Sequence, residues 1–334
     1  MIRRLLTLAT NKIYSLPVMV LMPHSRCNCR CVMCDIWKSN NDKKEISTDV
    51  LQQHIQTFKK LGVNRVALSG GEALMHANLW NFCDQLHAIG VKISLLSTGI
   101  LLAPHAHEVA THCDDVIVSL DGSRGVHNAI RNIPSAFEKL EQGVRALKQI
   151  DKNFPVTGRC VLQKLNFRDF PNVIRTAKQL GLDQISFLSA DVSSTAFNHV
   201  EGWQEEKAGG IALTPDETDE FEIIVEQSFV EFKEEYARKF IAESRDKIRS
   251  LVQYYRAIQG KASFPAHRCN APWVSAVLES NGDVMPCFFH KPYGNIFNGS
   301  FEEIINSEQA VSFRKKLDVN KNEICKKCVC SLYV

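Results

Sequence analysis

The sequence predicts an α/β fold, a partial TIM-like (β/α)6 barrel followed by a small cysteine-rich domain at the C-terminus. Three observations lead to this prediction. Six short apolar runs end in small or polar residues, as buried strands do. Helical stretches alternate with these runs, and three turns between them repeat one pattern, KLGVNRVAL, AIGVKISLL and QLGLDQISF. After about residue 190 this alternation stops, and a new group of cysteines begins at Cys269.

The six predicted strands alternate with helices, and such units build a parallel sheet with helices outside it. They lie at residues 17–22, 65–70, 92–99, 115–122, 156–162 and 184–190. Six units are fewer than the eight that close a barrel, so a curved and partly open barrel is expected. In this fold a functional site lies at the C-terminal ends of the strands.

Capping signals indicate where several helices begin and end. Ser135 and Glu138 have the spacing of a capping box ahead of a helix at 136–149. Thr214 and Glu217 have the same spacing, with a proline at the first helical position between them. The three repeated turns each place a glycine where a helix C-cap needs a left-handed residue, at Gly62, Gly90 and Gly181.

These patterns divide the chain into a barrel at 1–190, a helical connection at 191–268 and a cysteine-rich domain at 269–334. The last part opens with a hairpin, WVSAVLESNGDVMPC, in which Asn281-Gly282 is a strong turn signal. The first residues predict a short amphipathic helix. They lack a signal-peptide cleavage site, and the chain contains no apolar stretch long enough to span a membrane.

Composition narrows the range of possible functions and partners. The formal net charge of +3 on 334 residues argues against nucleic acid as a partner. Twelve cysteines without an export signal favour a reducing, cytoplasmic location, where clustered thiols bind metals more often than they form disulfides. Cys83, Cys113 and Cys160 stand singly among apolar neighbours and are predicted to be buried core residues.

The densest cysteine cluster is SRCNCRCVMCDIW, directly after the first predicted strand. Cys27, Cys31 and Cys34 in it have the spacing C-x3-C-x2-C. Three thiolates on a short loop can hold three irons of a [4Fe–4S] cluster and leave the fourth iron without a protein ligand. A zinc site would favour four ligands in paired C-x2-C spacing. Cys29 is interpreted as a bystander, because a thiol two residues from its neighbours on a tight loop rarely converges with the outer three.

This loop, together with SGGEAL at 69–74 after the second strand, resembles the radical S-adenosylmethionine (SAM) superfamily over residues 17–190. The resemblance implies that the open iron binds SAM, and that reductive cleavage yields methionine and a 5′-deoxyadenosyl radical, which abstracts a substrate hydrogen. Gly70 and Gly71 would let the backbone approach the methionyl part of SAM. Glu72 would shape the turn and face the amino group.

A second stretch, SLDGSRGVHNAIRNIPSAF, resembles a signature of the superfamily branch that carries additional C-terminal clusters. By this match Ser119 would contact the ribose of SAM and Arg131 its carboxylate. Asp121 and His127 would hold the loop together.

The C-terminal cysteines resemble the SPASM domain, or the shorter twitch domain, of radical SAM enzymes. A complete SPASM domain has more cysteines than the five present here, which suffice for one further [4Fe–4S] cluster. The preferred ligands are Cys269, Cys287, Cys325 and Cys328, with Cys330 as an alternative to one of them. A zinc ion is the competing occupant, although zinc has no redox chemistry with which to accept an electron.

The catalytic acid or base is not predicted. In sulfatase-maturing members an aspartate follows the cysteine at the position of Cys287, whereas this chain has Phe288 there. His290, Asp191 and Glu279 are weak substitutes.

The predicted function is hydrogen abstraction that oxidises or decarboxylates a small metabolite, with electrons from a flavodoxin or ferredoxin-like donor. About sixteen residues precede the first strand, which is short for the leader-recognition domain of many peptide-modifying members. A peptide-modifying maturase remains an alternative, as does an iron–sulfur electron-transfer protein without turnover. The SGGEAL turn discriminates against the latter, because an electron carrier needs no turn shaped for SAM.

Overall fold

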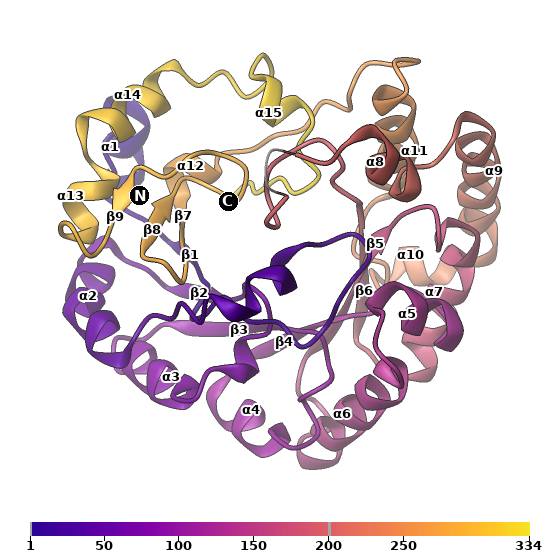
Figure 1. Cartoon of the computed structure of the whole chain (residues 1–334), viewed down its shortest axis with the longest axis horizontal. Helices are drawn as coiled ribbons and strands as arrows, with labels where there is room; N and C mark the ends of the chain where they lie inside the picture. Colours follow the sequence, from indigo (N-terminus) through magenta and orange to yellow (C-terminus); the bar gives the residue numbers. More distant parts are fainter. Residues whose placement is uncertain (1, 200–201) are drawn as a thin grey trace.

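The structure, a computed structural model, describes residues 2–199 and 202–334. Six parallel strands form a curved sheet surrounded by helices, as the sequence predicts, and the α/β partial-barrel fold is confirmed (Figure 1). Their order in the sheet follows their order in the chain. The strands are β1 (Val18–Leu21), β2 (Arg65–Leu68), β3 (Lys92–Ser97), β4 (Asp115–Ser119), β5 (Val156–Leu162) and β6 (Gln184–Ser189).

Helices that follow these strands pack against the outer face of the sheet (Figure 1). Val66 and Leu68 of β2 point toward them and are fully buried, whereas Arg65 and Ala67 alternate with these residues and are only partly buried. The barrel interior is therefore less tightly filled than the layer between sheet and helices. The elements are η1 (Ile36–Asn41), α2 (Thr48–Leu61), η2 (Ala73–Met75), α3 (Leu79–His87), α4 (Ala106–His112), α5 (Arg124–Arg131), α6 (Ala136–Ile150), η3 (Phe167–Asp169) and α7 (Phe170–Gln179).

Two kinds of capping signal had different outcomes. All three repeated turns contain the predicted left-handed glycine, with φ of 73°, 79° and 71° at Gly62, Gly90 and Gly181. The capping box predicted at Ser135 is wrong, because Ser135 itself is left-handed (φ 59°) and makes no side-chain cap. Asn128 replaces it by accepting a hydrogen bond from the backbone N–H of Phe137 at 2.8 Å, and Glu138 pairs with Arg124 at 3.1 Å.

The helical connection packs over the edge of the sheet at β6. Its predicted capping box is confirmed: Glu217 N–H donates to the Thr214 hydroxyl at 3.3 Å, and the Glu217 carboxylate accepts from Thr214 N–H at 2.8 Å. Tyr255 ties this layer to the barrel, since its hydroxyl donates to the carbonyl of Leu162 at 2.5 Å. The helices are α8 (Glu205–Ile211), α9 (Pro215–Glu231), α10 (Lys233–Ala237) and α11 (Arg245–Ile258).

The cysteine-rich part extends the barrel sheet. β7 (Ser275–Leu278) and β8 (Asp283–Met285) form the predicted hairpin, and β9 (Gly294–Asn295) pairs with β8. The sequence did not predict that β7 also pairs with β1, parallel and over the whole length of both strands. The two cysteine-bearing regions therefore grow from neighbouring strands of one sheet. Four helices complete this part, α12 (Ala271–Val274), α13 (Phe301–Ile305), α14 (Glu308–Lys316) and α15 (Glu323–Lys326).

The two ends of the chain lie on the same side of the molecule (Figure 1). α1 (Ile2–Thr10) is the predicted N-terminal helix, and Arg4 donates to the backbone carbonyl of Val334. Arg314, which is 1% exposed, donates to the carbonyls of Asn11 and Ile305, both at 2.7 Å. Over the described residues, no helix is long and apolar enough to cross a membrane.

Candidate metal centres and cofactor site

The cysteine loop between β1 and η1 is held in place by its backbone. The N–H groups of Arg30 and Val32 donate to the last carbonyls of α5, at 3.2 and 3.0 Å. Asn40 binds both sides of Cys27, accepting from its N–H at 2.8 Å and donating to its carbonyl at 2.9 Å. The loop that carries the three predicted ligands is thus preorganised by the protein around it.

The thiol of Cys31 lies near enough to those of Cys27 and Cys34 for its charge to affect both of them. Burial raises the pKa of Cys27 and of Cys34 to about 12, and the charge of Cys31 adds to both effects. The pKa of Cys31 is instead lowered to about 6, chiefly by a hydrogen bond from Cys29 and then by the guanidinium of Arg131. The three residues of the C-x3-C-x2-C pattern are therefore neighbours on the loop, and their role as iron ligands stays a prediction.

Cys29 differs from these three residues in its surroundings. Its side chain is 1% exposed, whereas Cys27 and Cys34 are partly exposed. The hydrogen bond to Cys31 raises the pKa of Cys29, which keeps Cys29 protonated as the donor. These surroundings are consistent with the interpretation of Cys29 as a bystander, which stays a prediction.

The glycine pair after β2 packs directly on the cysteine loop. Gly70 has φ +101°, a conformation that favours glycine. A Cβ on Gly71 would lie 2.0 Å from the carbonyl oxygen of Arg26 and 2.9 Å from the Cβ of Cys27. The sequence led us to attribute both glycines to the approach of SAM. The structure shows a second reason for a glycine at position 71, because a side chain there would occupy the space of the loop backbone beside Cys27.

Replacing Gly71 by alanine should therefore displace the cysteine loop. We expect the free energy of unfolding to fall by about 3 kcal/mol, since backbone and not a flexible side chain occupies the space, and iron binding at Cys27 to weaken. Thermal unfolding of the apoprotein and iron content after reconstitution measure the two effects. Gly125→Ala is the matched control, because a Cβ there meets no atom within 4 Å. Equal behaviour of the two variants would contradict the packing argument.

Glu72 is fully buried and joins the ends of two strands. Its carboxylate accepts hydrogen bonds from the hydroxyl of Ser97 at 3.0 Å and from the N–H and hydroxyl of Thr98 at 2.7 and 2.6 Å. Burial raises the pKa of Glu72, and these donors oppose that rise. His24 at the start of the cysteine loop contacts the Glu72 carbonyl oxygen through Nε2 at 2.8 Å. Glu72 thus holds the turn in shape, and its contact with the amino group of SAM stays a prediction.

Arg131 lies directly behind the cysteine loop, 6% exposed. One terminal nitrogen pairs with the Asp121 carboxylate at 2.5 Å, and the other donates to the Cys31 sulfur at 3.4 Å. Burial disfavours its charge, but Asp121 and Cys31 outweigh burial and raise the pKa of Arg131. The predicted contact of Arg131 with the SAM carboxylate is untested by this geometry, which adds a role toward Cys31. Ser119 ends β4, at the edge where a site is expected.

The tail cysteines gather near the end of β8. The charges of Cys269 and Cys325 both act on Cys287, whose pKa burial raises to about 12, and Cys269 and Cys287 act on Cys328. The four preferred ligands therefore form one group. Cys330 adjoins them through its N–H, which donates to the Cys328 sulfur at 3.3 Å.

The weak candidates for a base have other contacts. His290 Nε2 lies 3.3 Å from the Cys325 sulfur, and Asp191 accepts from the N–H of Ser193 at 3.1 Å.

Phe288 stacks on Phe197, with ring centroids 6.2 Å apart. The sequence analysis missed the segment containing Phe197, whose carbonyl accepts from the N–H of the residue after Cys34 at 3.1 Å. Nothing in the local sequence signals this contact between the helical connection and the cysteine loop.

The donor sets, which consist of cysteine thiols, fit iron–sulfur clusters. Within 2–199 and 202–334, no three His, Cys, Asp or Glu side chains are close enough to hold one metal ion. A zinc ion draws four thiolates to about 2.3 Å from one point, whereas the irons of a cubane are separate and accept thiolates farther apart. Both donor sets consist of thiols, which are the ligands that iron–sulfur clusters require.

Comparison with known protein families gives two matches. A sequence profile of the radical SAM superfamily matches residues 21–177, and a profile of the SPASM iron–sulfur cluster-binding domain matches residues 269–329. The matched ranges contain the seven cysteines that are the preferred ligands, and Cys330 lies just beyond the second range. The radical SAM domain binds a [4Fe–4S] cluster and SAM, and the SPASM domain is an iron–sulfur cluster-binding domain.

Curated relatives have several activities. An AdoMet-dependent heme synthase of Methanosarcina barkeri is 29% identical over 46% of this chain and 45% of its own length. The subtilosin biosynthesis protein AlbA of Bacillus subtilis is 24% identical over 84% and 58%. The mycofactocin maturase MftC of Mycobacterium ulcerans is 33% identical over 37% and 33%. The chain thus spans between about a third and three-fifths of these relatives' length.

Solved structures of similar fold cover nearly the whole chain. Streptococcus suis SuiB bound to its precursor peptide SuiA has a TM-score of 0.69 at 13% identity, covering 98% of this chain and 74% of SuiB. The enzyme anSMEcpe with bound AdoMet has a TM-score of 0.67 at 19% identity, covering 92% and 88%. At these identities the likeness concerns the fold.

Proposed function

This chain belongs to the radical SAM superfamily and carries a SPASM iron–sulfur domain, and we propose that it oxidises an organic substrate after abstracting a hydrogen atom from it. When bound, the [4Fe–4S] cluster with SAM supplies a 5′-deoxyadenosyl radical, and a second cluster supplies a redox centre for the remaining electron. Cys27, Cys31 and Cys34 would hold the first cluster.

The observation that carries this proposal is the rigid connection between the glycine turn and the cysteine loop. Gly71 leaves space for the carbonyl of Arg26, whose oxygen also accepts from the N–H of Glu72 at 3.0 Å. A protein that only carries electrons needs its thiolates, but it does not need a second strand end fixed against them. This arrangement supports a site in which SAM binds beside the cluster, with Gly70, Gly71, Glu72, Ser119 and Arg131 as the proposed contacts.

The test is an anaerobic assay on the reconstituted chain. With dithionite and SAM we expect 5′-deoxyadenosine and methionine in equal amounts, quantified by chromatography. Clusters that form and are reduced without any 5′-deoxyadenosine would instead favour the electron-carrier alternative. In the cell, a flavodoxin or ferredoxin-like protein is the proposed reductant.

The tail has its own role in this proposal. Cys269, Cys287, Cys325 and Cys328 would hold the second cluster, and the division at 190 and 268 separates the part that binds SAM from the part that accepts an electron. The SPASM match and the grouping of these four thiols support this assignment over a structural zinc ion.

The proposed substrate is a small metabolite, and a peptide is the second candidate. The peptide is kept as a candidate because of the likeness to AlbA, which extends over 84% of this chain. Cell extract separated by mass discriminates between them: a small metabolite predicts that the low-mass fraction stimulates 5′-deoxyadenosine formation and that protease treatment leaves this stimulation unchanged. Loss of the stimulation after protease treatment would indicate a peptide.

A further inference from the structure

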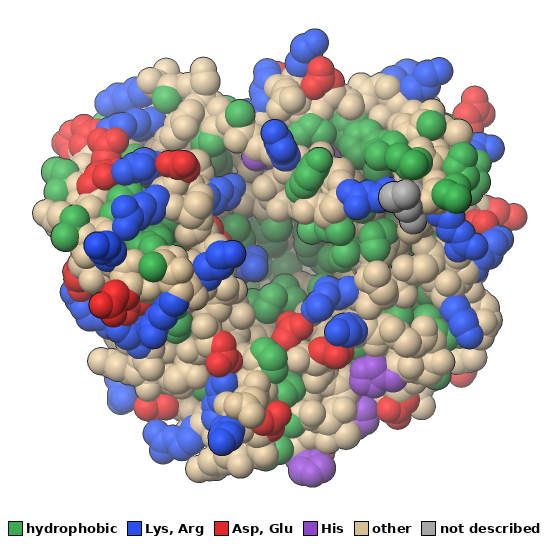
Figure 2. All heavy atoms as spheres, turned by 180° about the vertical axis from the view of Figure 1, so that it is seen from behind, with side chains coloured by type: hydrophobic (Ala, Val, Ile, Leu, Met, Phe, Trp, Pro, Cys, Tyr) green, Lys and Arg blue, Asp and Glu red, His purple; other side chains and the backbone are tan. Residues whose placement is uncertain are grey.

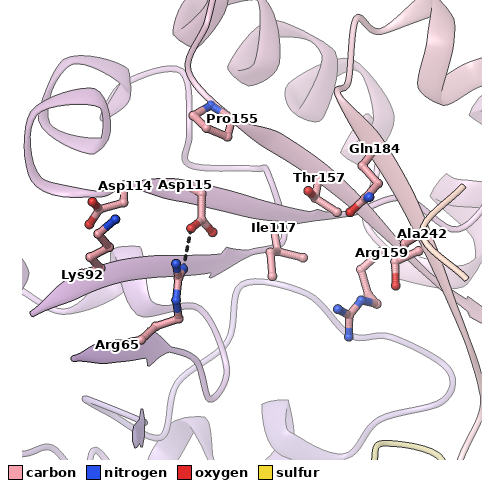
Figure 3. Close-up of a pocket in the computed structure, with 11 residues that line it drawn as sticks. Arg65, Lys92, Asp114, Asp115, Ile117, Pro155, Thr157, Arg159, Gln184 and Ala242 are labelled. Atoms are coloured by element: carbon pink, nitrogen blue, oxygen red, sulfur yellow. Dashed lines mark hydrogen bonds and ion pairs between the residues drawn. The ribbon is translucent and has the colours of Figure 1, made fainter. Parts of the chain in front are cut away.

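The barrel interior contains a cavity with charged walls. Seen from behind, the molecule is hollowed at its centre, with hydrophobic side chains at the floor and charged side chains of both signs around it (Figure 2). A cavity of about 560 Å³ lies along the inner faces of β2 to β6. Its polar lining comes from alternate residues of these strands and from the turns before them (Figure 3).

Most charges in this cavity have partners. Arg65 pairs with Asp115 at 2.9 Å and donates to the hydroxyl of Ser94 at 2.7 Å. Asp114 accepts a hydrogen bond from the backbone N–H of Ile93 at 2.7 Å. These groups stabilise the ends of the strands, and they account for both acidic residues of the lining.

Arg159 is different. Across residues 2–199 and 202–334 its guanidinium has neither a hydrogen-bond acceptor nor a carboxylate partner, and its Nε is buried. Figure 3 shows its side chain extending from β5 into the open centre of the cavity. Glu243 lies near, but its carboxylate accepts from the hydroxyl of Ser186 at 2.7 Å and from the N–H of Phe187 at 3.0 Å. Burial raises the pKa of Glu243 and the charge of Arg159 opposes that rise, but among the described residues no ion pair joins the two side chains.

The register of the sheet places Arg159 beside the last residue of β4. Arg159 pairs with Ser119 of β4, the predicted ribose contact, and with Ser186 of β6. A ligand held by Arg159 would therefore lie beside the end of β4, where Ser119 stands.

We propose that Arg159 binds one carboxylate group of the substrate inside the barrel. This assignment rests on the proposed function, because it concerns the same site. A partly buried guanidinium without a partner is costly, and its planar fork matches a carboxylate through two parallel hydrogen bonds. The lining has three basic residues, Arg65, Lys92 and Arg159, and two acidic ones, Asp114 and Asp115. The excess of one positive charge suits a ligand with one negative charge better than a phosphate of higher charge. The substrate class is thus a carboxylic acid.

Matched probes test this on the full chain, anaerobically reconstituted with iron and sulfide. The acid 3-phenylpropionate and its neutral amide, 3-phenylpropanamide, have nearly the same shape, and binding is followed by ligand-detected NMR titration. We expect the acid to bind the wild type at least about tenfold more tightly than the amide, as a charge-assisted pair would give. Arg159→Gln should remove this difference, and Arg159→Lys should retain part of it.

Arg145→Gln is the control, because the same change is made on an exposed arginine of α6 that lies outside the cavity. It should bind the acid as the wild type does. Equal binding of acid and amide to the wild type, or unchanged acid preference in Arg159→Gln, overturns the inference, and the wild-type comparison needs no variant to fold. The 5′-deoxyadenosine assay is independent of these titrations, so failure of the proposed function is recognised separately.

Discussion

Replacing Cys31 by alanine should abolish 5′-deoxyadenosine formation and lower the iron content of the reconstituted protein from about eight to about four per chain. Cys31 is the thiol whose pKa is lowered to about 6, and it receives the hydrogen bond from Arg131 at 3.4 Å. Its loss leaves two thiolates on the loop, too few to hold a cubane with one open iron. Iron analysis and the SAM cleavage assay measure the two effects.

Cys29→Ser is the control for this variant. It changes a cysteine of the same loop, and a hydroxyl can still donate to Cys31, so about eight irons should remain. If Cys31→Ala keeps its full iron content while Cys29→Ser loses about four irons, the assignment of ligands within the loop is wrong.

The second large effect is expected in the tail. Exchanging Cys325 and Cys328 together for alanine should also lower the iron content from about eight to about four per chain. The remaining iron should keep the spectrum of the first cluster, including its change on addition of SAM, because Cys27, Cys31 and Cys34 are untouched. Iron analysis and electron paramagnetic resonance of the reduced protein measure this.

A zinc ion in the tail predicts a different result for this double variant. If the tail holds a zinc ion, the double variant loses zinc and its iron content stays the same. Cys330→Ser separates the two ligand assignments, since it should leave the iron content at about eight only if Cys328 is the ligand. The hydrogen bond from Cys330 N–H to the Cys328 sulfur at 3.3 Å is consistent with that choice.

Much of the barrel could be predicted because its signals are local. Each strand is a short apolar run, and the left-handed glycines that end the preceding helices depend only on backbone geometry. The box at Ser135 failed for a tertiary reason. Asn128 in the preceding helix occupies the capping role, and no pattern of spacing shows which of two nearby polar residues will do so.

The sequence predicted the candidate ligands of the site, but it did not predict most of the contacts that surround them. The spacing of Cys27, Cys31 and Cys34 is a local pattern, whereas the contact of Gly71 with Arg26 joins residues from two loops. The pairing of β7 with β1 links segments more than 250 residues apart, as Val18 and Ser275 show. Arg159 did leave a signal: in VTGRCVL it interrupts an apolar strand at a position that faces the barrel interior.

The ladder between β1 and β7 has a mechanical consequence. Met22, where the chain leaves β1 toward the first thiols, donates its N–H to the carbonyl of Leu278 at 2.9 Å. The strand that leads to one redox centre thus shares hydrogen bonds with the hairpin that leads to the other. The shared hydrogen bonds hold the two redox centres at a constant distance from each other. Electron transfer between them would therefore not require a domain movement. Removing the tail would also expose the unpaired edge of β1, and an unpaired strand edge promotes aggregation.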